Sequence, residues 1–242
     1  MSLFEGHKTL GEAGFFEGLV DFHSHILPGV DDGIKLLEHS LQVLEYYEKL
    51  GVNTVWCTPH VYEDLPNKTE ALKERFAQLN EAYKGKVRLM LAAEYMLDHE
   101  FASRLEAGDL LPIGDDHDHL LVETSFFNGP ENLENLFDRI LSKGFYPVLA
   151  HPERYIYMDK SDYLKWKEKK VKFQLNYTAL TGLYGKEALK KASWLLKNEM
   201  YDACGSDLHN VRFATEAKSE LANLSVKSKA AARLLNLKHP NC

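Results

Sequence analysis

The feature that most constrains the fold is an alternation of short apolar runs with amphipathic helical patterns along most of the chain. This alternation predicts an α/β fold with a parallel sheet, because each helix carries the chain back to begin another strand in the same direction. The predicted strands lie at 19–23, 52–60, 88–94, 119–123, 146–151, 172–176 and 201–209. All seven end in polar or ionisable residues. Since the strand C-termini of a parallel barrel open onto one face, the pattern predicts an α/β barrel whose chemistry converges there.

Six of the seven strand ends carry side chains that bind divalent metal ions. At the first end the motif H-S-H places the imidazoles of His23 and His25 on the same side of an extended segment. Imidazole and carboxylate together suit zinc, manganese or iron, whereas calcium and magnesium sites are richer in oxygen. The candidate ligands are His23, His25, His60, Glu94, Glu123, His151, Asp207 and His209, with Asp32 in the loop after the first strand. Their joint placement predicts a multinuclear metal site.

Each candidate ligand taken alone has a simpler structural explanation. His23 and His25 are as consistent with a hydrogen-bonded pair as with a metal site, because histidine is also an ordinary polar residue. A lone Glu94 or Glu123 is more often a solvated or hydrogen-bonded carboxylate, and His60 would suit the cap of a turn. The coincidence at six strand ends is what favours metal binding.

The composition is that of one globular domain. The chain has 242 residues, of which 45% are hydrophobic and 27% charged, and α/β barrels hold about 200–250 residues in a single domain. We therefore predict one domain over residues 1–242, with 1–16 as a peripheral N-terminal segment. No apolar run approaches the roughly 18 residues of a membrane span. The N-terminus lacks the pattern of a secretory signal, so we predict a cytoplasmic protein without membrane insertion.

Charge and cysteine content exclude further classes of protein. A net charge of −7 disfavours nucleic acid as a partner, because phosphate backbones are held by clustered lysine and arginine. Three cysteines without close spacing argue against a disulfide framework and against a cysteine zinc site. A cysteine-dependent phosphatase needs an arginine six residues after its thiolate, and neither Cys57 nor Cys204 has one. The sequence therefore excludes a cysteine-dependent phosphatase.

Six motifs together resemble the polymerase-and-histidinol-phosphatase (PHP) superfamily. They are H-S-H-I-L-P-G-V-D-D-G at 23–33, C-T-P-H at 57–60, A-A-E-Y at 92–95, V-E-T-S at 122–125, A-H-P-E-R-Y at 150–155 and G-S-D-L-H-N at 205–210. Within the superfamily they are most similar to bacterial manganese-dependent protein-tyrosine phosphatases of capsule and exopolysaccharide loci. The resemblance covers about residues 19–213. It implies a distorted seven-stranded (β/α) TIM-like barrel that holds three divalent metal ions, with manganese as the family's metal and iron or zinc as alternatives.

The resemblance also implies three sets of ligands, carried over by position. The first set is His23, His25, Glu94 and Asp207; the second is Glu94 as a bridge, Glu123 and His151; the third is Asp32, His60 and His209. Asp32 is preferred to Asp31 because it stands at the matching position. No ligand of the family pattern is missing, which disfavours the alternative of a non-catalytic, regulatory metalloprotein.

The chemistry expected of this site is hydrolysis of a phosphomonoester. Paired metal ions acidify a bound water, and direct attack of the resulting hydroxide on phosphorus requires no protein nucleophile. Arg154 is the expected phosphate clamp, because a guanidinium binds two oxygens at once. Its structural alternative is a surface ion pair. Arg212, three residues after His209, is a second candidate clamp, although the family more often places its second arginine further along this loop.

Two classes of substrate stay open at this point. The resemblance implies a phosphotyrosine protein, above all a bacterial tyrosine kinase, whereas a relative within the superfamily would act on a small phosphomonoester such as histidinol phosphate. The short predicted loops favour a protein substrate, because long capping loops would restrict the site to a metabolite. Tyr62, Tyr155 and Tyr157 are candidates either for stacking on a phosphotyrosyl ring or for packing at the barrel rim.

Overall fold

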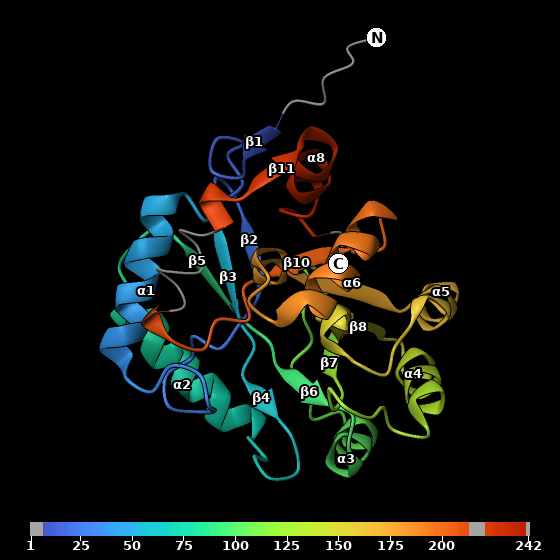
Figure 1. Cartoon of the computed structure of the whole chain (residues 1–242). Helices are drawn as coiled ribbons and strands as arrows, with labels where there is room; N and C mark the ends of the chain where they lie inside the picture. Colours follow the sequence, from blue (N-terminus) through green and yellow to red (C-terminus); the bar gives the residue numbers. More distant parts are fainter. Residues whose placement is uncertain (1–6, 213–220, 241–242) are drawn as a thin grey trace.

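Parallel strands converge on one centre in the computed structural model, and most helices lie outside them (Figure 1). The model describes residues 7–212 and 221–240. Its strands are β1 His7–Thr9, β2 Val20–Ser24, β3 Thr54–Cys57, β4 His60–Val61, β5 Arg88–Leu91, β6 Glu94–Met96, β7 His119–Glu123, β8 Tyr146–Ala150, β9 Lys172–Asn176, β10 Ala203–Gly205 and β11 Ser225–Lys227. Its helices are α1 Leu37–Leu50, α2 Thr69–Ala82, α3 His99–Ala107, α4 Leu133–Ser142, α5 Lys160–Glu168, α6 Gly185–Lys197 and α8 Ser228–Asn236, with 3-10 helices η1 Pro152–Arg154 and η2 Tyr177–Thr181.

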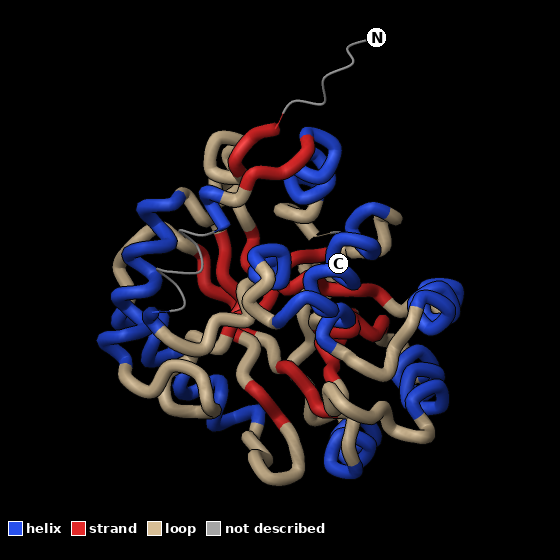
Figure 2. Tube along the Cα trace, viewed as in Figure 1, coloured by secondary structure: helices blue, strands red, loops and turns tan. Residues whose placement is uncertain are grey.

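Two parallel sheets curl around the common centre (Figure 2). One has the strand order β2-β3-β5, and the other has the order β10-β9-β8-β7-β6-β4. A parallel bridge between Ser24 and Leu208 joins the end of β2 to the segment after β10. The predicted α/β class with parallel strand pairing is therefore confirmed.

Two of the seven predicted strands are each divided into two short strands. The predicted strand at 52–60 appears as β3 and β4, separated by Thr58 and Pro59. Proline has no N–H to donate to a sheet ladder, so the regular pairing stops there. The predicted strand at 88–94 appears as β5 and β6, separated by Ala92 and Ala93. In each case the first part pairs within the three-stranded sheet and the second part within the six-stranded sheet.

An apolar plug fills the space between the strands beneath their C-terminal ends. Its members are buried side chains from both sheets and from the segment before β7: Phe22, Trp56, Ala92, Ile113, Leu121, Val148, Ala150 and Ala203. Close-packed apolar side chains leave few voids as large as a water molecule. The plug therefore separates the polar groups at the strand C-termini from the opposite end of the strands.

The described part of the N-terminal segment is anchored in the core. Leu10 and Phe15 have no exposed surface, and Phe16 is 5% exposed. Strand β1 pairs with β11 in an antiparallel ribbon, which ties this segment to the C-terminal region. The prediction of a single domain over 1–242 stays a prediction. Among the described residues, no helix combines the length and the apolar character needed to cross a bilayer.

Candidate metal centre

All nine predicted ligands lie together at the C-terminal ends of the parallel strands. Their donor atoms form four overlapping groups, and within each group the atoms lie within 4.8 Å of one another. The groups are His25, Asp32, His60 and His209; His23, His25 and Asp207; His23, Glu94 and His151; and His60, Glu94 and Glu123. The strands thus bring together residues that are up to 186 positions apart, between His23 and His209. No predicted ligand lies outside the cluster.

Glu94 stands at the middle of the cluster with no exposed surface. Its Oε2 lies 3.1 Å from His23 Nε2, 3.3 Å from His25 Nε2 and 3.0 Å from His60 Nδ1. Its Oε1 lies 3.2 Å from His151 Nε2. One carboxylate therefore faces four imidazoles, as a bridging metal ligand would.

The hydrogen-bonding pattern of the cluster fits bound cations. Among the described residues, Glu94 Oε2 and His60 Nδ1 are buried atoms without a hydrogen bond of acceptable geometry, although the two lie 3.0 Å apart. Burial would raise the pKa of Glu94, but the neighbouring His23 and His60 hold that pKa well below its usual value. Buried polar groups normally have partners, and a donor set of imidazole and carboxylate suits zinc, manganese or iron. The residues present therefore fit a metal centre.

His60 lies between the predicted second and third ligand sets. Its Nδ1 is 3.0 Å from Glu123 Oε1, and its Nε2 is 3.6 Å from Asp32 Oδ1. His151, predicted to share an ion with Glu123, lies 3.8 Å from that carboxylate. The geometry thus groups the nine side chains in one cluster, while the assignment of each to a particular ion stays a prediction.

Asp31 orients two of the candidate ligands. It was assigned no role from the sequence, because Asp32 stands at the position that matches the family's ligand. Its carboxylate accepts hydrogen bonds from His25 Nδ1 at 2.8 Å, from the backbone N–H of Gly33 at 2.9 Å and from that of His60 at 3.0 Å. The bond to Nδ1 directs His25 Nε2 toward the centre. A Cβ at Gly33 would lie 2.3 Å from the carbonyl oxygen of His25, so only glycine fits there. The adjacent aspartates in D-D-G therefore differ in role.

We expect Asp31→Asn to weaken metal binding about 10–100-fold without unfolding the protein. An asparagine that keeps its oxygen toward His25 Nδ1 turns its NH₂ group toward the backbone N–H of Gly33, so two donors face each other and the turn that holds the side chain is disturbed. The neutral amide is also a weaker acceptor than the carboxylate, so His25 is held less firmly. Calorimetric titration of chelator-treated protein with manganese measures the effect. Asp115→Asn, at an exposed position, is the control, and equal affinities for the two variants would contradict the role assigned to Asp31.

Gln174 orients His23 in the same way. Its Oε1 accepts from His23 Nδ1 at 2.9 Å, and both side chains are fully buried. The sequence signal was a polar residue between the apolar Phe173 and Leu175 in the predicted strand K-F-Q-L-N. Sequence reasoning missed it because glutamine is not itself a metal ligand of this type of site.

Two candidate ligands have left-handed backbone conformations. The φ angle is 53° at Asp207 and 35° at His151, a region that residues other than glycine rarely adopt. The backbone N–H of Asp207 donates to the carbonyl oxygen of His23 at 2.8 Å. Ser206 Oγ donates to the same oxygen at 3.1 Å. These bonds hold the strained loop in place, and such strain is concentrated at functional sites.

Arg154 lies at the edge of the cluster, where the phosphate clamp was predicted. Its Nη1 donates to Asp207 Oδ2 at 2.5 Å, and its side chain is 20% exposed. The guanidinium carbon is 4.2 Å from the ring centroid of Phe126 and 4.5 Å from that of Tyr184. The two rings fix the guanidinium plane by cation–π contact. Its partner in the ion pair is a buried carboxylate of the cluster and not a surface group, and its role as a phosphate clamp stays a prediction.

The remaining residues predicted to contact the substrate are Arg212 and three tyrosines, and they differ in how far they are buried. Arg212 is exposed and is the last described residue before 213–220, so its role stays a prediction. Tyr155 has no exposed surface, and its hydroxyl accepts from the backbone N–H of Thr124 at 3.3 Å. It therefore packs the rim and is not available for stacking. Tyr62 and Tyr157 are half-buried, and the Tyr62 ring lies 5.9 Å from that of His60.

Glu153, between the predicted ligand His151 and Arg154, is a buried acid with a perturbed pKa. Burial raises that pKa from 4.5 to about 7, although Tyr201 Oη and the Asn176 N–H each donate to the carboxylate at 2.9 Å and lower it. A raised acid pKa favours the folded state at low pH. That stabilisation is present below pH 4.5 and is lost as the pH rises through about 7.

We therefore expect the unsubstituted protein to lose stability relative to Glu153→Gln as the pH rises, because glutamine does not ionise. The free energy of unfolding of the variant minus that of the unsubstituted protein should increase by about 2 kcal/mol between roughly pH 5 and pH 8. Urea unfolding of both proteins in chelator, across this range, measures it. Glu168→Gln, at an exposed position on α5, is the control for the charge change. A constant difference would disprove the burial of an ionising carboxylate at Glu153.

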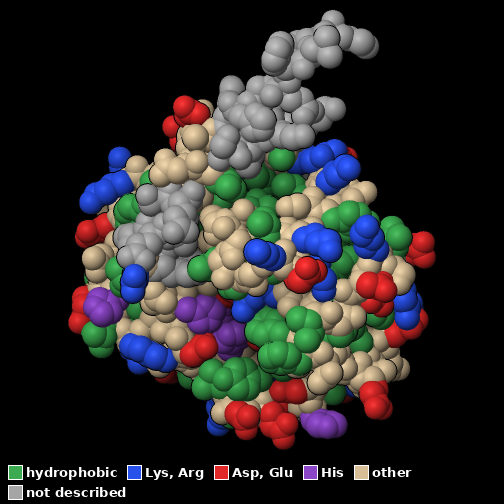
Figure 3. All heavy atoms as spheres, viewed as in Figure 1, with side chains coloured by type: hydrophobic (Ala, Val, Ile, Leu, Met, Phe, Trp, Pro, Cys, Tyr) green, Lys and Arg blue, Asp and Glu red, His purple; other side chains and the backbone are tan. Residues whose placement is uncertain are grey.

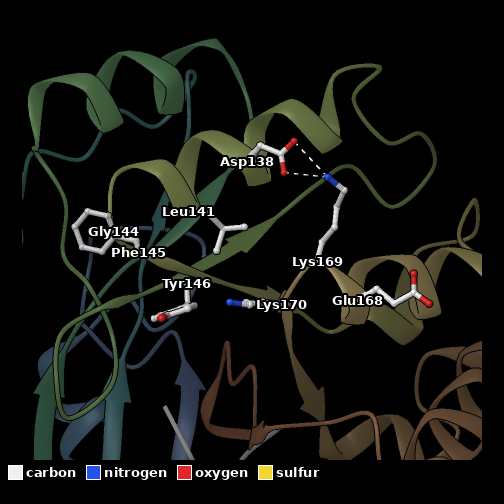
Figure 4. A pocket seen from close by; sticks show the side chains of 8 residues that line it. All are labelled: Asp138, Leu141, Gly144, Phe145, Tyr146, Glu168, Lys169 and Lys170. Carbon is white, nitrogen blue, oxygen red and sulfur yellow. Dashed lines mark hydrogen bonds and ion pairs between the residues drawn. The ribbon is translucent and has the colours of Figure 1, made fainter.

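A separate cavity of about 420 Å³ lies at the opposite end of the strands. Tyr146, the first residue of β8, is part of its lining, whereas His151 follows the last residue of the same strand. Within the cavity wall, Lys169 pairs with Asp138 at 3.0 Å (Figure 4). This cavity contains no predicted ligand, and we assign it no part in the metal centre.

Comparison with known proteins identifies the family. A family model described as "Capsular polysaccharide synthesis, CpsB/CapC" matches residues 19–231. The chain belongs to the CpsB/CapC family. The resemblance inferred from the six motifs is thereby confirmed, and the match covers both sheets and every predicted ligand.

Curated relatives of this CpsB/CapC chain are tyrosine-protein phosphatases by name. YwqE from Bacillus subtilis is 29% identical over 203 residues, which cover 80% of this chain and 78% of the relative. CpsB from Streptococcus pneumoniae is 28% identical over 210 residues, which cover 80% of this chain and 84% of the relative. A solved structure from a study of YwqE and CpsB, described there as "unique metal-dependent tyrosine phosphatases", superposes with a TM-score of 0.76. It is 28% identical and covers 84% of each chain.

Proposed function

We propose that this chain is a metal-dependent protein-tyrosine phosphatase that acts in the cytoplasm on a phosphotyrosine protein, above all a bacterial tyrosine kinase of capsule or exopolysaccharide synthesis. The observation that carries the proposal is the cluster of nine ligand-type side chains with a half-buried arginine at its edge. The names of the CpsB/CapC relatives support the same activity. The prediction of a metal-dependent tyrosine phosphatase made from the sequence agrees with them.

We further propose that the centre holds three divalent ions, with manganese as the first candidate and iron or zinc as alternatives. The ligand sets are those predicted by position, and the overlap of four donor groups supports more than one ion. We also propose that the strands form a distorted seven-stranded barrel. The division of β3 from β4 and of β5 from β6, together with the bridge between Ser24 and Leu208, supports a single ring of seven.

The chain's own residues would bind and orient the phosphoryl group. Bound divalent ions would supply positive charge for the phosphoryl oxygens and a nucleophilic hydroxide near neutral pH. Arg154 presents a planar pair of donors held between Phe126 and Tyr184, so it binds two phosphoryl oxygens without first losing conformational freedom. The apolar plug excludes water from beneath. A tyrosine leaving group has a pKa near 10, so its departure requires less help from a general acid than an alkoxide would.

The test is phosphate release from a phosphotyrosine peptide and from histidinol phosphate, measured side by side. Protein reloaded with manganese is compared with chelator-treated protein. Preferential, chelator-sensitive turnover of the peptide supports the proposal. Turnover of histidinol phosphate alone would retain the metal centre and refute the protein substrate, and no turnover of either by metal-loaded protein would refute the phosphatase activity on both classes.

A further inference from the structure

Two adjoining cavities lead away from Arg154 along α6. The first, of about 360 Å³, is lined in part by Phe126, Arg154 and Tyr184. The second, of about 610 Å³, is lined in part by Met158 and Trp194. Both cavities share Ile156, Glu187 and Lys191 as lining residues. They therefore form one groove that begins at the phosphate-binding edge of the metal centre.

The first cavity has the position and walls expected for the aromatic ring of the substrate. A phosphate held by Arg154 leaves the attached ring beside the guanidinium, where Phe126 and Tyr184 are the aromatic neighbours. The Phe126 ring centroid is also 5.5 Å from that of His151, so the wall is continuous with the metal centre. Aromatic rings of this kind favour offset or edge-to-face contact with another ring.

The second cavity has an apolar floor. Met158 is 2% exposed and Trp194 is half-buried. Lys191, although it lines both cavities, turns its ammonium toward the backbone, where it donates to the carbonyl oxygens of Tyr155 and Met158. Its charge is therefore used to hold the 155–158 loop, and its methylene groups face the groove.

Exposed apolar side chains lie at this groove and next to one of its walls in the chain. Ile156, which lines both cavities, is 65% exposed, and Leu183, which precedes the lining residue Tyr184, is 50% exposed. Figure 3 shows hydrophobic side chains gathered beside histidines on one face of the molecule. The Ile156 N–H donates to the carbonyl oxygen of Phe126 at 2.9 Å, so the two loops that bear the groove are tied together. Clustered exposure of apolar groups marks a binding surface.

We propose that the second cavity binds a bulky apolar side chain of the residue next to phosphotyrosine in the substrate. The inference rests on the proposed function and specifies its substrate class, a phosphopeptide with an apolar neighbour. The continuity of the two cavities carries it: a peptide whose ring occupies the first cavity must pass its adjoining residue over Ile156, the residue that both cavities share. A small phosphomonoester would leave the second cavity unused.

The test uses three phosphotyrosine peptides and para-nitrophenyl phosphate. One peptide has alanine at every flanking position, and the other two replace the alanines either before or after phosphotyrosine with leucine. We expect one leucine peptide to exceed the alanine peptide about tenfold in kcat/KM. Trp194→Ser should remove that gain while leaving kcat/KM for para-nitrophenyl phosphate within about twofold, because Trp194 lines the second cavity and not the first. Ser161→Glu, at an exposed position that lines only the second cavity, should have the same effect by placing a charge there, and it provides the test where Trp194→Ser does not fold.

Phe127→Ser is the matched control. Phe127 is 67% exposed and lies one residue after Phe126, but it lines neither cavity. It should retain the gain from leucine. Equal turnover of all three peptides by the unsubstituted protein, or the same loss in Phe127→Ser as in the variants of the second cavity, would overturn the inference and leave the tyrosine phosphatase intact. Failure of the unsubstituted protein to hydrolyse any phosphopeptide would instead refute the proposed function, and the inference with it.

Discussion

Glu94→Gln should lower kcat/KM on a phosphotyrosine peptide by more than about 10³-fold and should reduce the metal content of the purified protein. Changes to groups that only orient a ligand cost about 10–100-fold in metal affinity or activity, and Glu94 is placed as a bridging ligand. Its two oxygens face four imidazoles. Glutamine replaces one oxygen with an NH₂ group, which cannot bind a cation and brings two hydrogens toward the histidines. Elemental analysis together with steady-state kinetics measures both effects.

Glu106→Gln is the matched control for this substitution. Glu106 is 54% exposed on α3, where it pairs with Arg139 and Lys143. The same chemical change there should leave metal content and kcat/KM unchanged, because exposed ion pairs contribute little to stability. Full metal content with full activity in Glu94→Gln would refute its place at the middle of the centre. Full metal content with lost activity would assign Glu94 to the reaction but not to metal retention.

The convergence of the nine predicted ligands on one place could be predicted from the sequence. Residue type indicates the chemistry, and the parallel topology determines where the side chains meet. His60 and Glu94 each follow an apolar run, and parallel strands bring such positions to one edge. Neither step needs an accurate strand boundary. A shift of one or two residues in a predicted strand still leaves its ionisable end at the same edge of the parallel sheets.

The division of two strands could not be predicted in the same way. Pro59 is visible in the sequence and cannot donate a backbone hydrogen bond. Whether this interrupts the strand depends on which neighbouring strand would have offered a carbonyl oxygen to that donor. That neighbour is set by long-range pairing: His60 lies opposite Glu94 in the six-stranded sheet, whereas Cys57 lies opposite Leu91 in the three-stranded one. Strand continuity is thus a property of the assembled sheet and not of one segment.

The residues that orient the ligands were the least predictable part of the site. Asp31 and Asp32 are adjacent and identical in type, yet Asp31 is 6% exposed and bonds to His25, while the side chain of Asp32 is 69% exposed. Only the turn at Gly33, which brings the loop back over His25, distinguishes them. Gln174 is similar, since its contact with His23 spans 151 positions. Such partners follow from geometry that no local pattern encodes.

Arg154→Ala should lower kcat/KM on a phosphotyrosine peptide by about 10²–10³-fold while leaving the metal content unchanged. The magnitude is that of removing one preorganised donor to a transition-state oxyanion. The retained metal separates this variant from Glu94→Gln, because Arg154 contacts the Asp207 carboxylate from the edge of the centre. Arg139→Ala, which removes a guanidinium from a surface ion pair on α4, is the control and should match the unsubstituted protein in both measurements.

Arg154→Lys then separates charge from geometry. A lysine retains the positive charge, but it cannot bind two oxygens in one plane or lie flat between Phe126 and Tyr184. We expect it to recover less than about a tenth of the activity lost in Arg154→Ala. If lysine restores full activity, charge alone suffices and the aromatic walls have no role in orienting the clamp. If alanine itself retains full activity, the phosphate must be held by other groups, and Arg154 would serve only to neutralise the buried Asp207.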